Sequence, residues 1–278
     1  MIKKGRQKLD AICISSALAM IEFFTDVVNI VTKHYPFLLR GVGYTMLIAI
    51  VGTLAGLLIG LATGVLRTCP LSKNLLLRCL QKFLNCIIAV YVEVFRGTPM
   101  MVQAMVIYWG YAFATGGSQL PLIPSGILIV SINTGAYMAE IVRGGIISVD
   151  KGQFEGAAAV GMTHWQSMRY VIIPQVLRNI LPSVANEFVI NIKDTSVLNV
   201  IGVTELYYFA GIIKRQSFQT FQTYFVVCVI YFILTYSVTR ILRLIEKKLE
   251  GGDSFVICGS QSDPKAEIRV KKQEVHHG

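Results

Sequence analysis

The chain has 278 residues, of which 54% are apolar and only 15% are charged. Soluble domains carry about 25% charged residues, so this composition excludes an ordinary soluble domain and predicts that lipid is the main solvent. The net charge is +10, but the basic residues lie at the ends of apolar segments and are not interleaved with an aromatic platform. This pattern favours membrane topology signals and argues against nucleic-acid binding.

Residues 1–34 form a basic N-terminus followed by an apolar or amphipathic helix. Residues 11–32 are apolar enough to cross a membrane, yet polar residues recur on one stripe at helical spacing, namely Ser15, Glu22, Asp26, Asn29 and Lys33. A polar stripe favours a helix that lies in the membrane interface, whereas the basic start favours a crossing with the N-terminus inside. We expect the interfacial arrangement, and the crossing remains the alternative.

Residues 41–66 carry no charge and are bracketed by Arg40 and Arg67, so they predict the first membrane span. Glycine recurs in this span at every fourth position, namely Gly52, Gly56, Gly60 and Gly64. In lipid, such spacing makes a smooth face on which another helix backbone packs closely.

Four further spans are expected, at residues 80–113, 124–148, 174–198 and 218–245. The segment from Glu93 to Pro99 interrupts the second span, because proline removes a backbone donor and kinks a helix. Residues 199–217 are expected to be a loop. The fold class is therefore all-α: a polytopic membrane bundle of five core helices plus the N-terminal helix. The core occupies residues 35–248, and the polar residues 249–278 predict a disordered tail.

Lysine and arginine are concentrated in alternate connections. Residues 67–82, residues 143–178 and the segment after residue 240 are rich in them, whereas residues 114–123 contain none. The positive-inside rule places the rich connections in the cytoplasm, so the C-terminus and the connection around Glu155 are expected to be cytoplasmic.

The cytoplasmic connection from residue 153 to 182 contains a compact stretch of small residues. Glu155 is expected in the first turn of a short helix, where a carboxylate suits the helix dipole, and Gly161 is expected to end it at the C′ position. Between them, Gly156, Ala157 and Ala158 leave almost no side-chain bulk, so the helix would fit a narrow groove of a partner protein. An ordinary amphipathic loop helix is the alternative.

Signatures of catalysis are missing from the sequence. It has no Gly-x-x-x-x-Gly-Lys-Ser/Thr motif for ATP, no His-Glu-x-x-His and no Gly-x-Ser-x-Gly. The cysteines and histidines do not have metal-ligand spacing. We therefore expect no catalytic residues, no metal site and no enzyme activity in this chain.

The run Glu155-Gly156-Ala157, followed by Gly161 and by Val171-x-Ile173-Pro174, resembles the EAA loop of bacterial ABC-importer permeases. Three further segments resemble the polar amino acid uptake branch of that family, namely residues 91–103, 136–145 and 190–196. The resemblance covers roughly residues 35–248. Gly156 stands where the family usually has alanine.

The resemblance implies a function as the permease subunit of an ATP-driven amino acid importer in the bacterial inner membrane. The implied partners are ABC ATPase subunits, an external amino acid-binding protein and a second permease chain, identical or related. This chain would bind no cofactor, because ATP and Mg²⁺ belong to the ATPase. Coupling would run through Glu155, Gly156, Ala157, Ala158 and Gly161.

A zwitterionic solute needs polar groups along a low-dielectric path, and the spans supply a set of candidates. They are Arg96, Thr98, Gln103, Asn133, Tyr137, Glu140, Asn186, Asn191, Lys193, Asp194, Thr195 and Ser196. For Glu93 with Arg96, and for Glu140 with Arg143, an internal ion pair that stabilises packing is the alternative.

Two other functions fit parts of the sequence. A secondary transporter or channel would explain charges within the spans, but it leaves the slim cytoplasmic helix without a role. A membrane scaffold would leave the polar residues of the spans unexplained.

Overall fold

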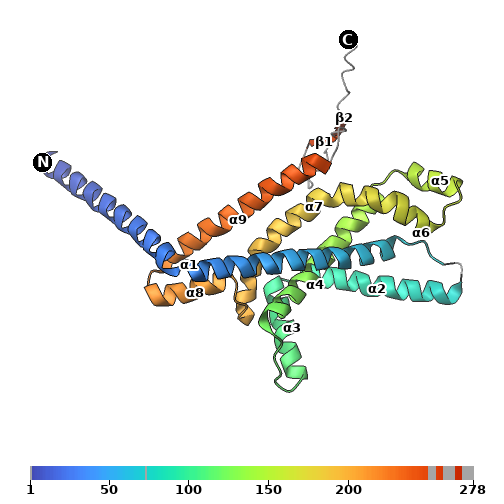
Figure 1. Cartoon of the computed structure of the whole chain (residues 1–278), viewed down its shortest axis with the longest axis horizontal. Helices are drawn as coiled ribbons and strands as arrows, with labels where there is room; N and C mark the ends of the chain where they lie inside the picture. Colours follow the sequence, from blue (N-terminus) through green and yellow to red (C-terminus); the bar gives the residue numbers. More distant parts are fainter. Residues whose placement is uncertain (1, 73, 250–254, 259–266, 271–278) are drawn as a thin grey trace, which may run out of the picture.

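The structure is a computed structural model that describes residues 2–72, 74–249, 255–258 and 267–270. Its helices, in chain order, are α1 (Ile2–Thr68), α2 (Leu75–Gly97), α3 (Met100–Ala114), α4 (Leu122–Ile147), α5 (Lys151–Ala159), α6 (His164–Ser167), the π-helix η1 (Met168–Ile172), α7 (Ile173–Asp194), the 3₁₀-helix η2 (Thr195–Ile201), α8 (Leu206–Ser217) and α9 (Thr220–Leu249). The predicted all-α membrane bundle is confirmed (Figure 1).

Within the described residues, four helices are long and apolar enough to cross a membrane, or up to five if a bent pair is counted as one span. The four are in α1, α2, α4 and α9, and the bent pair runs from His164 to Ser217 with an angle of 58° at its break. These segments correspond to the five spans expected from the sequence.

The predicted N-terminal helix and the first span form one continuous helix. At 67 residues, α1 would measure about 100 Å if straight, three times the thickness of a bilayer core. It contains Pro36, and Figure 1 shows that α1 changes direction beside α8 and α9. Only its second part, from about Arg40 onward, is therefore available as the first span.

The glycine stripe of α1 packs directly on α4. A Cβ atom added to Gly52 would lie 2.6 Å from Val130 Cγ1, one added to Gly56 would lie 2.7 Å from Thr134 Cβ, and one added to Gly64 would lie 2.7 Å from Val142 Cγ1. Gly60 meets Met138, again four residues along both helices. The predicted close approach of a second helix is confirmed.

The second predicted span consists of two helices. The predicted interruption is where α2 ends, at Gly97, and Pro99 is the N-cap of α3. Helix α3 then runs in a different direction from α2 (Figure 1). With 15 residues it is about 22 Å long, too short to cross a bilayer core.

The prediction of a loop at residues 199–217 is wrong. Helix α8 occupies most of it, because Leu206, Phe209 and Ile213 recur at helical spacing and are buried against the bundle. The side chain of Glu205 caps the start of α8, and Lys214 and Arg215 lie in its last turn, where they complement the helix dipole.

The structure describes part of residues 249–278, which the sequence predicts to be a disordered tail. Strands β1 (Phe255–Cys258) and β2 (Glu267–Val270) pair antiparallel, with Phe255 opposite Val270. The other positions after residue 249 lie outside the described residues.

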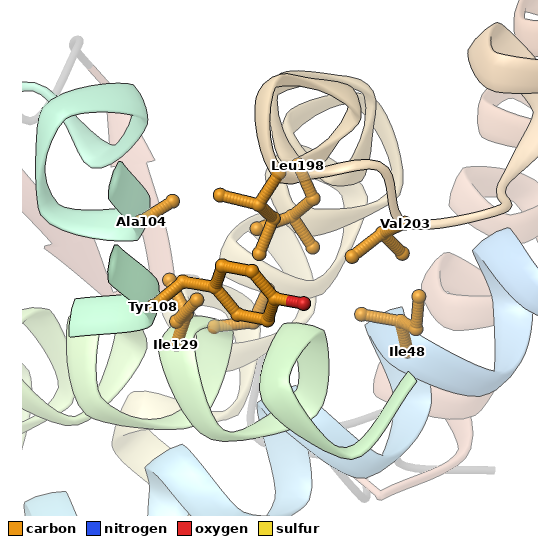
Figure 2. Packing of buried hydrophobic residues seen from close by; sticks show 8 residues of the cluster. Ile48, Ala104, Tyr108, Ile129, Leu198 and Val203 are labelled. Atoms are coloured by element: carbon orange, nitrogen blue, oxygen red, sulfur yellow. The ribbon is translucent and has the colours of Figure 1, made fainter. Parts of the chain in front are cut away.

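Among the described residues, two of the three large apolar clusters of the core include residues of α4. One joins α1, α3, α4 and η2 through Ile48, Tyr108, Ile129 and Leu198 (Figure 2). The other joins the ends of α1 and α4 to η1 and α7, and it includes Val65, Val142, Met168, Ile172 and Val176. Helix α4 contributes to both clusters, so it is the central element of the fold.

We expect Gly60→Ala to destabilise the bundle by about 1–3 kcal/mol, because the new methyl group would overlap Met138 and the chain would have to move. The control is Gly43→Ala in the same helix, where an added Cβ has no neighbour within 4 Å. Thermal unfolding of both variants in detergent checks the prediction, and equal midpoints would contradict it.

Candidate functional site

Helix α5 is a short helix closed at both ends. The Asp150 side chain accepts a hydrogen bond from the Gly152 N–H at its start. At its end, the Gly161 N–H donates to Ala158 O and the Met162 N–H donates to Ala157 O, each at 3.0 Å. Gly161 has a φ of 81°, so this is the Schellman arrangement. The predicted helix end at Gly161 is confirmed.

The prediction that Glu155 lies in the first turn of this helix is wrong. The helix begins at Lys151, one turn earlier, because Asp150 supplies the N-cap carboxylate. Glu155 is exposed on the second turn of α5, so its carboxylate is available to a partner and does not cap its own helix.

The exposed side of α5 is slim, and bulky apolar side chains lie beside it. Gly156, Ala158 and Ala159 are exposed, and a Cβ atom added to Gly156 would have no neighbour within 4 Å. Val160, Trp165 and Tyr170 are exposed nearby, with Trp165 at 62%. This end of the molecule therefore presents exposed apolar side chains near a helix that is thin enough to fit a groove of a partner. Such a surface is typical of a protein-binding site.

The opposite side of α5 is anchored to the bundle. Ala157 is buried, and Phe154 packs on the cluster that contains Val149, Met168 and Ile172. Gln175 of α7 donates a hydrogen bond to the Gln153 side chain at 3.2 Å. Helix α5 is thus in contact with α7 and with the apolar cluster to which α4 contributes.

A buried amide pair joins α3 to α4. Asn133 Nδ2 donates to Gln103 Oε1 at 2.8 Å. Gln103 Nε2 in turn donates at 2.9 Å to the carbonyl oxygens of Phe95 and Thr98 and to the Thr98 hydroxyl. These acceptors lie at the break between α2 and α3, so the network holds the break in place.

A second buried network begins at the next residue of α4. Thr134 donates from its hydroxyl to Asn191 Oδ1 at 3.1 Å, and Asn191 Nδ2 donates to Thr53 Oγ1 at 2.7 Å. These three residues come from α4, α7 and α1. The structure therefore brings Thr98, Gln103, Asn133 and Asn191 of the predicted set together around the middle of α4.

Other residues of the predicted set lie on the surface of the single chain. Arg96 is exposed, with its guanidinium 5.6 Å from the ring centre of half-buried Tyr137. Lys193 and Asn186 are exposed, and Asp194 and Ser196 are partly buried. Thr195 is buried at the start of η2, and its hydroxyl donates to Ile192 O near the end of α7. The predicted set therefore has a buried part and an exposed part.

Glu140 forms an ion pair with Arg67 and another with Arg143, at 2.8 Å. The first of these pairs joins the end of α1 to α4, and it supports the packing interpretation for Glu140. Among the ion pairs of the described residues, none joins Glu93 to Arg96, and both of these side chains are exposed. Groups of three or more metal-ligating side chains are likewise not found in the part of the chain that is described.

The sequence interpretation missed Glu205. Its side chain is fully buried and accepts hydrogen bonds from the N–H groups of Tyr207, at 2.9 Å, and Tyr208, at 2.7 Å. It also accepts a hydrogen bond from the Tyr231 hydroxyl at 2.7 Å, while Thr45 Oγ1 accepts one from the Leu206 N–H. Glu205 thus joins α8 to α9, and the neighbouring Leu206 N–H joins α8 to α1. Glutamate is not a preferred N-cap residue, so the local sequence carried little signal for this role.

The sequence of the chain is similar to those of known proteins. The model of a family described as "Binding-protein-dependent transport system inner membrane component" matches residues 78–251. The glutamine transport system permease protein GlnP of Escherichia coli (strain K12) is 36% identical over 215 residues, which cover 77% of this chain and 94% of that protein. A putative protein of the same description from Rickettsia felis is 33% identical, covering 78% of this chain and 96% of that protein.

Solved structures have the same fold. A crystal structure of an amino acid ABC transporter with histidines superposes with a TM-score of 0.67 at 35% identity, over 78% of this chain and 96% of that chain. An inward-facing structure of the MetNI methionine ABC transporter superposes with a TM-score of 0.65 at 20% identity, over 78% and 98%. The second likeness concerns the fold alone.

We expect Glu205→Ala to lower the free energy of unfolding by at least about 2 kcal/mol, because it leaves three partly buried donors without their acceptor. The control is Glu246→Ala near the end of α9, a carboxylate outside the described ion pairs. Thermal unfolding in detergent measures both changes, and a Glu205 variant as stable as the control would contradict the assigned role.

Proposed function

The chain belongs to the family of binding-protein-dependent transport system inner membrane components and is a permease subunit of an ABC importer, and from this premise we propose that it imports an amino acid. The likeness to glutamine permeases and to an amino acid ABC transporter, each over more than three quarters of the chain, carries the proposal. An ATPase-independent transporter is not favoured, because the relatives are subunits of ABC systems.

Energy comes from outside this chain. The family implies association with an ATPase and a substrate-binding protein, and a permease subunit does not itself hydrolyse ATP. We place the ATPase contact on the exposed side of α5, with Glu155, Gly156, Ala158 and the helix end at Gly161. Ala157, although predicted to belong to this contact, is buried and instead anchors α5 to the bundle.

The exposed charges on the spans support a path shared with a second permease chain. Glu93 and Arg96 are exposed on α2, and Lys193 is exposed at the end of α7. A charged side chain on a lipid-facing helix costs up to about 2.5–3.5 kcal/mol on insertion scales, the value for the helix centre. A partner permease, identical or related, and a water-filled path between the two chains would remove this cost.

The chemistry along this path fits an amino acid. Arg96 offers a guanidinium to the substrate carboxylate, and the carboxylates of Glu93 and Asp194 offer acceptors to the ammonium group. The buried amides of Gln103 and Asn133 lie directly behind the α2–α3 break. Their hydrogen bonds hold the end of α2 in place, and Arg96 lies on this part of α2 at the side of the proposed path.

The protein is a multi-pass membrane protein of the inner-membrane transport class. We propose that α5 and the C-terminus face the cytoplasm, because the lysine- and arginine-rich connections lie at that end of the chain's spans.

We expect Glu155→Lys to reduce ATP-driven uptake at least about tenfold, because it reverses the charge on the proposed contact surface. The measurement is amino acid uptake by liposomes that contain the permease, its ATPase and the binding protein. Glu246→Lys makes the same charge change on α9, outside the proposed contact residues of α5, and is expected to retain uptake. Normal uptake by the Glu155 variant, with normal insertion, would contradict the coupling role.

We expect Arg96→Gln to raise the half-saturating substrate concentration of uptake about tenfold, because a charge-assisted hydrogen bond to the carboxylate is lost. Arg240→Gln is the matched control, since Arg240 also lies over a tyrosine ring, that of Tyr236, at 4.9 Å. If both variants kept the original concentration dependence, Arg96 would not bind the substrate.

A further inference from the structure

Residues 18–39 of α1, here called the N-terminal arm, precede the first span and lie before the matched family region. The arm packs on the start of α9. Phe23 lies 5.4 Å from Phe221 and 5.2 Å from Phe225 between ring centres, and Gln222 Nε2 donates a hydrogen bond to Asp26 Oδ2 at 3.2 Å. The position of the arm in the membrane is therefore tied to the start of α9.

The length of α9 fixes that position. From Thr220 to the first basic residue, Arg240, the helix rises about 30 Å, which matches the thickness of a bilayer core. Helix α9 runs from the end of the bundle that holds α8 toward the end that holds α5 (Figure 1). The start of α9, and with it Phe23 and Asp26, thus lies at the bilayer surface opposite α5.

The first span leaves no room for the arm inside the bilayer. Between Arg40 and Arg67, α1 rises about 40 Å, which already exceeds the core thickness. The residues before Arg40 therefore continue beyond the surface opposite α5, turn back through the membrane or lie along that surface.

The arm has three distinct faces, and they decide between these possibilities. One face is covered by α8 and α9 and includes Phe23, Ile30, His34 and Leu38. A second face is apolar and exposed: Ile21, Phe24, Val28, Val31, Tyr35 and Leu39. The third face is polar and exposed: Glu22, Thr25, Asn29, Thr32 and Lys33.

Neither water alone nor hydrocarbon alone is a suitable solvent for an arm with these three faces. An arm that projected into water would expose the whole apolar face, and an arm that crossed the bilayer would place Glu22, Asn29 and Lys33 in hydrocarbon. A helix in the interface buries the apolar face among acyl chains and leaves the polar face in water.

We propose that the N-terminal arm binds phospholipid, lying in the headgroup–acyl boundary of the bilayer surface opposite α5. Its apolar face enters the acyl region, and its covered face holds α8 and the start of α9 at a fixed depth. The change of direction of α1 beside α8 lets the arm leave the axis of the first span (Figure 1).

The test is a nitroxide scan of the arm in the full-length permease, on a background with its cysteines replaced by serine. Labels are placed one at a time at Phe24 and Val28 on the apolar face and at Glu22 and Asn29 on the polar face. All four positions are exposed, so the labels displace no packed side chain. Leu54 and Leu58, exposed within the first span, calibrate the depth scale.

The protein is reconstituted in phosphatidylethanolamine–phosphatidylglycerol vesicles, and collision with oxygen is compared with collision with a water-soluble nickel chelate. Labels at residues 24 and 28 are expected to collide several-fold more with oxygen and to lie shallower than the labels at 54 and 58. Labels at residues 22 and 29 are expected to favour the nickel chelate.

Two results would overturn the proposal. Depth that increases steadily from residue 29 toward residue 22 would show a second crossing, and nickel access at all four positions would show an arm in water. A second measurement does not need the labels: Val28→Asp should lower the thermal midpoint in vesicles more than Asn29→Asp, and equal midpoints would contradict lipid binding. Neither measurement depends on transport, so the outcome is independent of the proposed substrate.

Discussion

The close contact between the glycine stripe of α1 and α4 is the constraint on which the bundle depends. Between these helices there is no room for a Cβ atom at Gly52, Gly56, Gly60 or Gly64. In lipid, no water is released when apolar helices meet, so close packing and interhelical hydrogen bonds must hold them together. The stripe therefore stabilises the bundle and also fixes the register of α1 against α4 at four successive points.

The register of α1 against α4 determines which polar side chains meet in the bundle. Because Gly56 sits on Thr134, the neighbouring Thr53 comes within reach of Asn191, whose other side-chain atom accepts from Thr134. The adjacent Asn133 donates to Gln103, which in turn donates to the α2–α3 break. The same helix ends at Ile147, three residues before Asp150, the N-cap of α5. One central helix thus connects the polar centre, the break beside Arg96 and the surface that we assign to the ATPase.

Features set by local chemistry could be predicted from the sequence, whereas features set by distant neighbours could not. The glycine spacing, the break at Pro99 and the helix end at Gly161 each follow from the backbone properties of glycine or proline. The sequence predicts the start of α5 one turn too late because Asp150 and Glu155 both suit a helix N-terminus. Helix α8 is not predicted because its apolar run is short and ends at Lys214 and Arg215, and Glu205 acquires its role only where α8 meets α9.

The charged residues of the membrane segments form two groups. One group stabilises the packing of the chain, and we assign the other group to transport. Glu140 is satisfied inside the chain by Arg67 and Arg143 at the ends of α1 and α4, where it adds to the contact that the glycine stripe begins. Arg96 and Glu93 are exposed and are not joined by any ion pair of the described residues. A bilayer would not tolerate such groups unless water, a solute or another chain met them. The sites that the single chain leaves unsatisfied are therefore those at which we expect the amino acid and the second permease to bind.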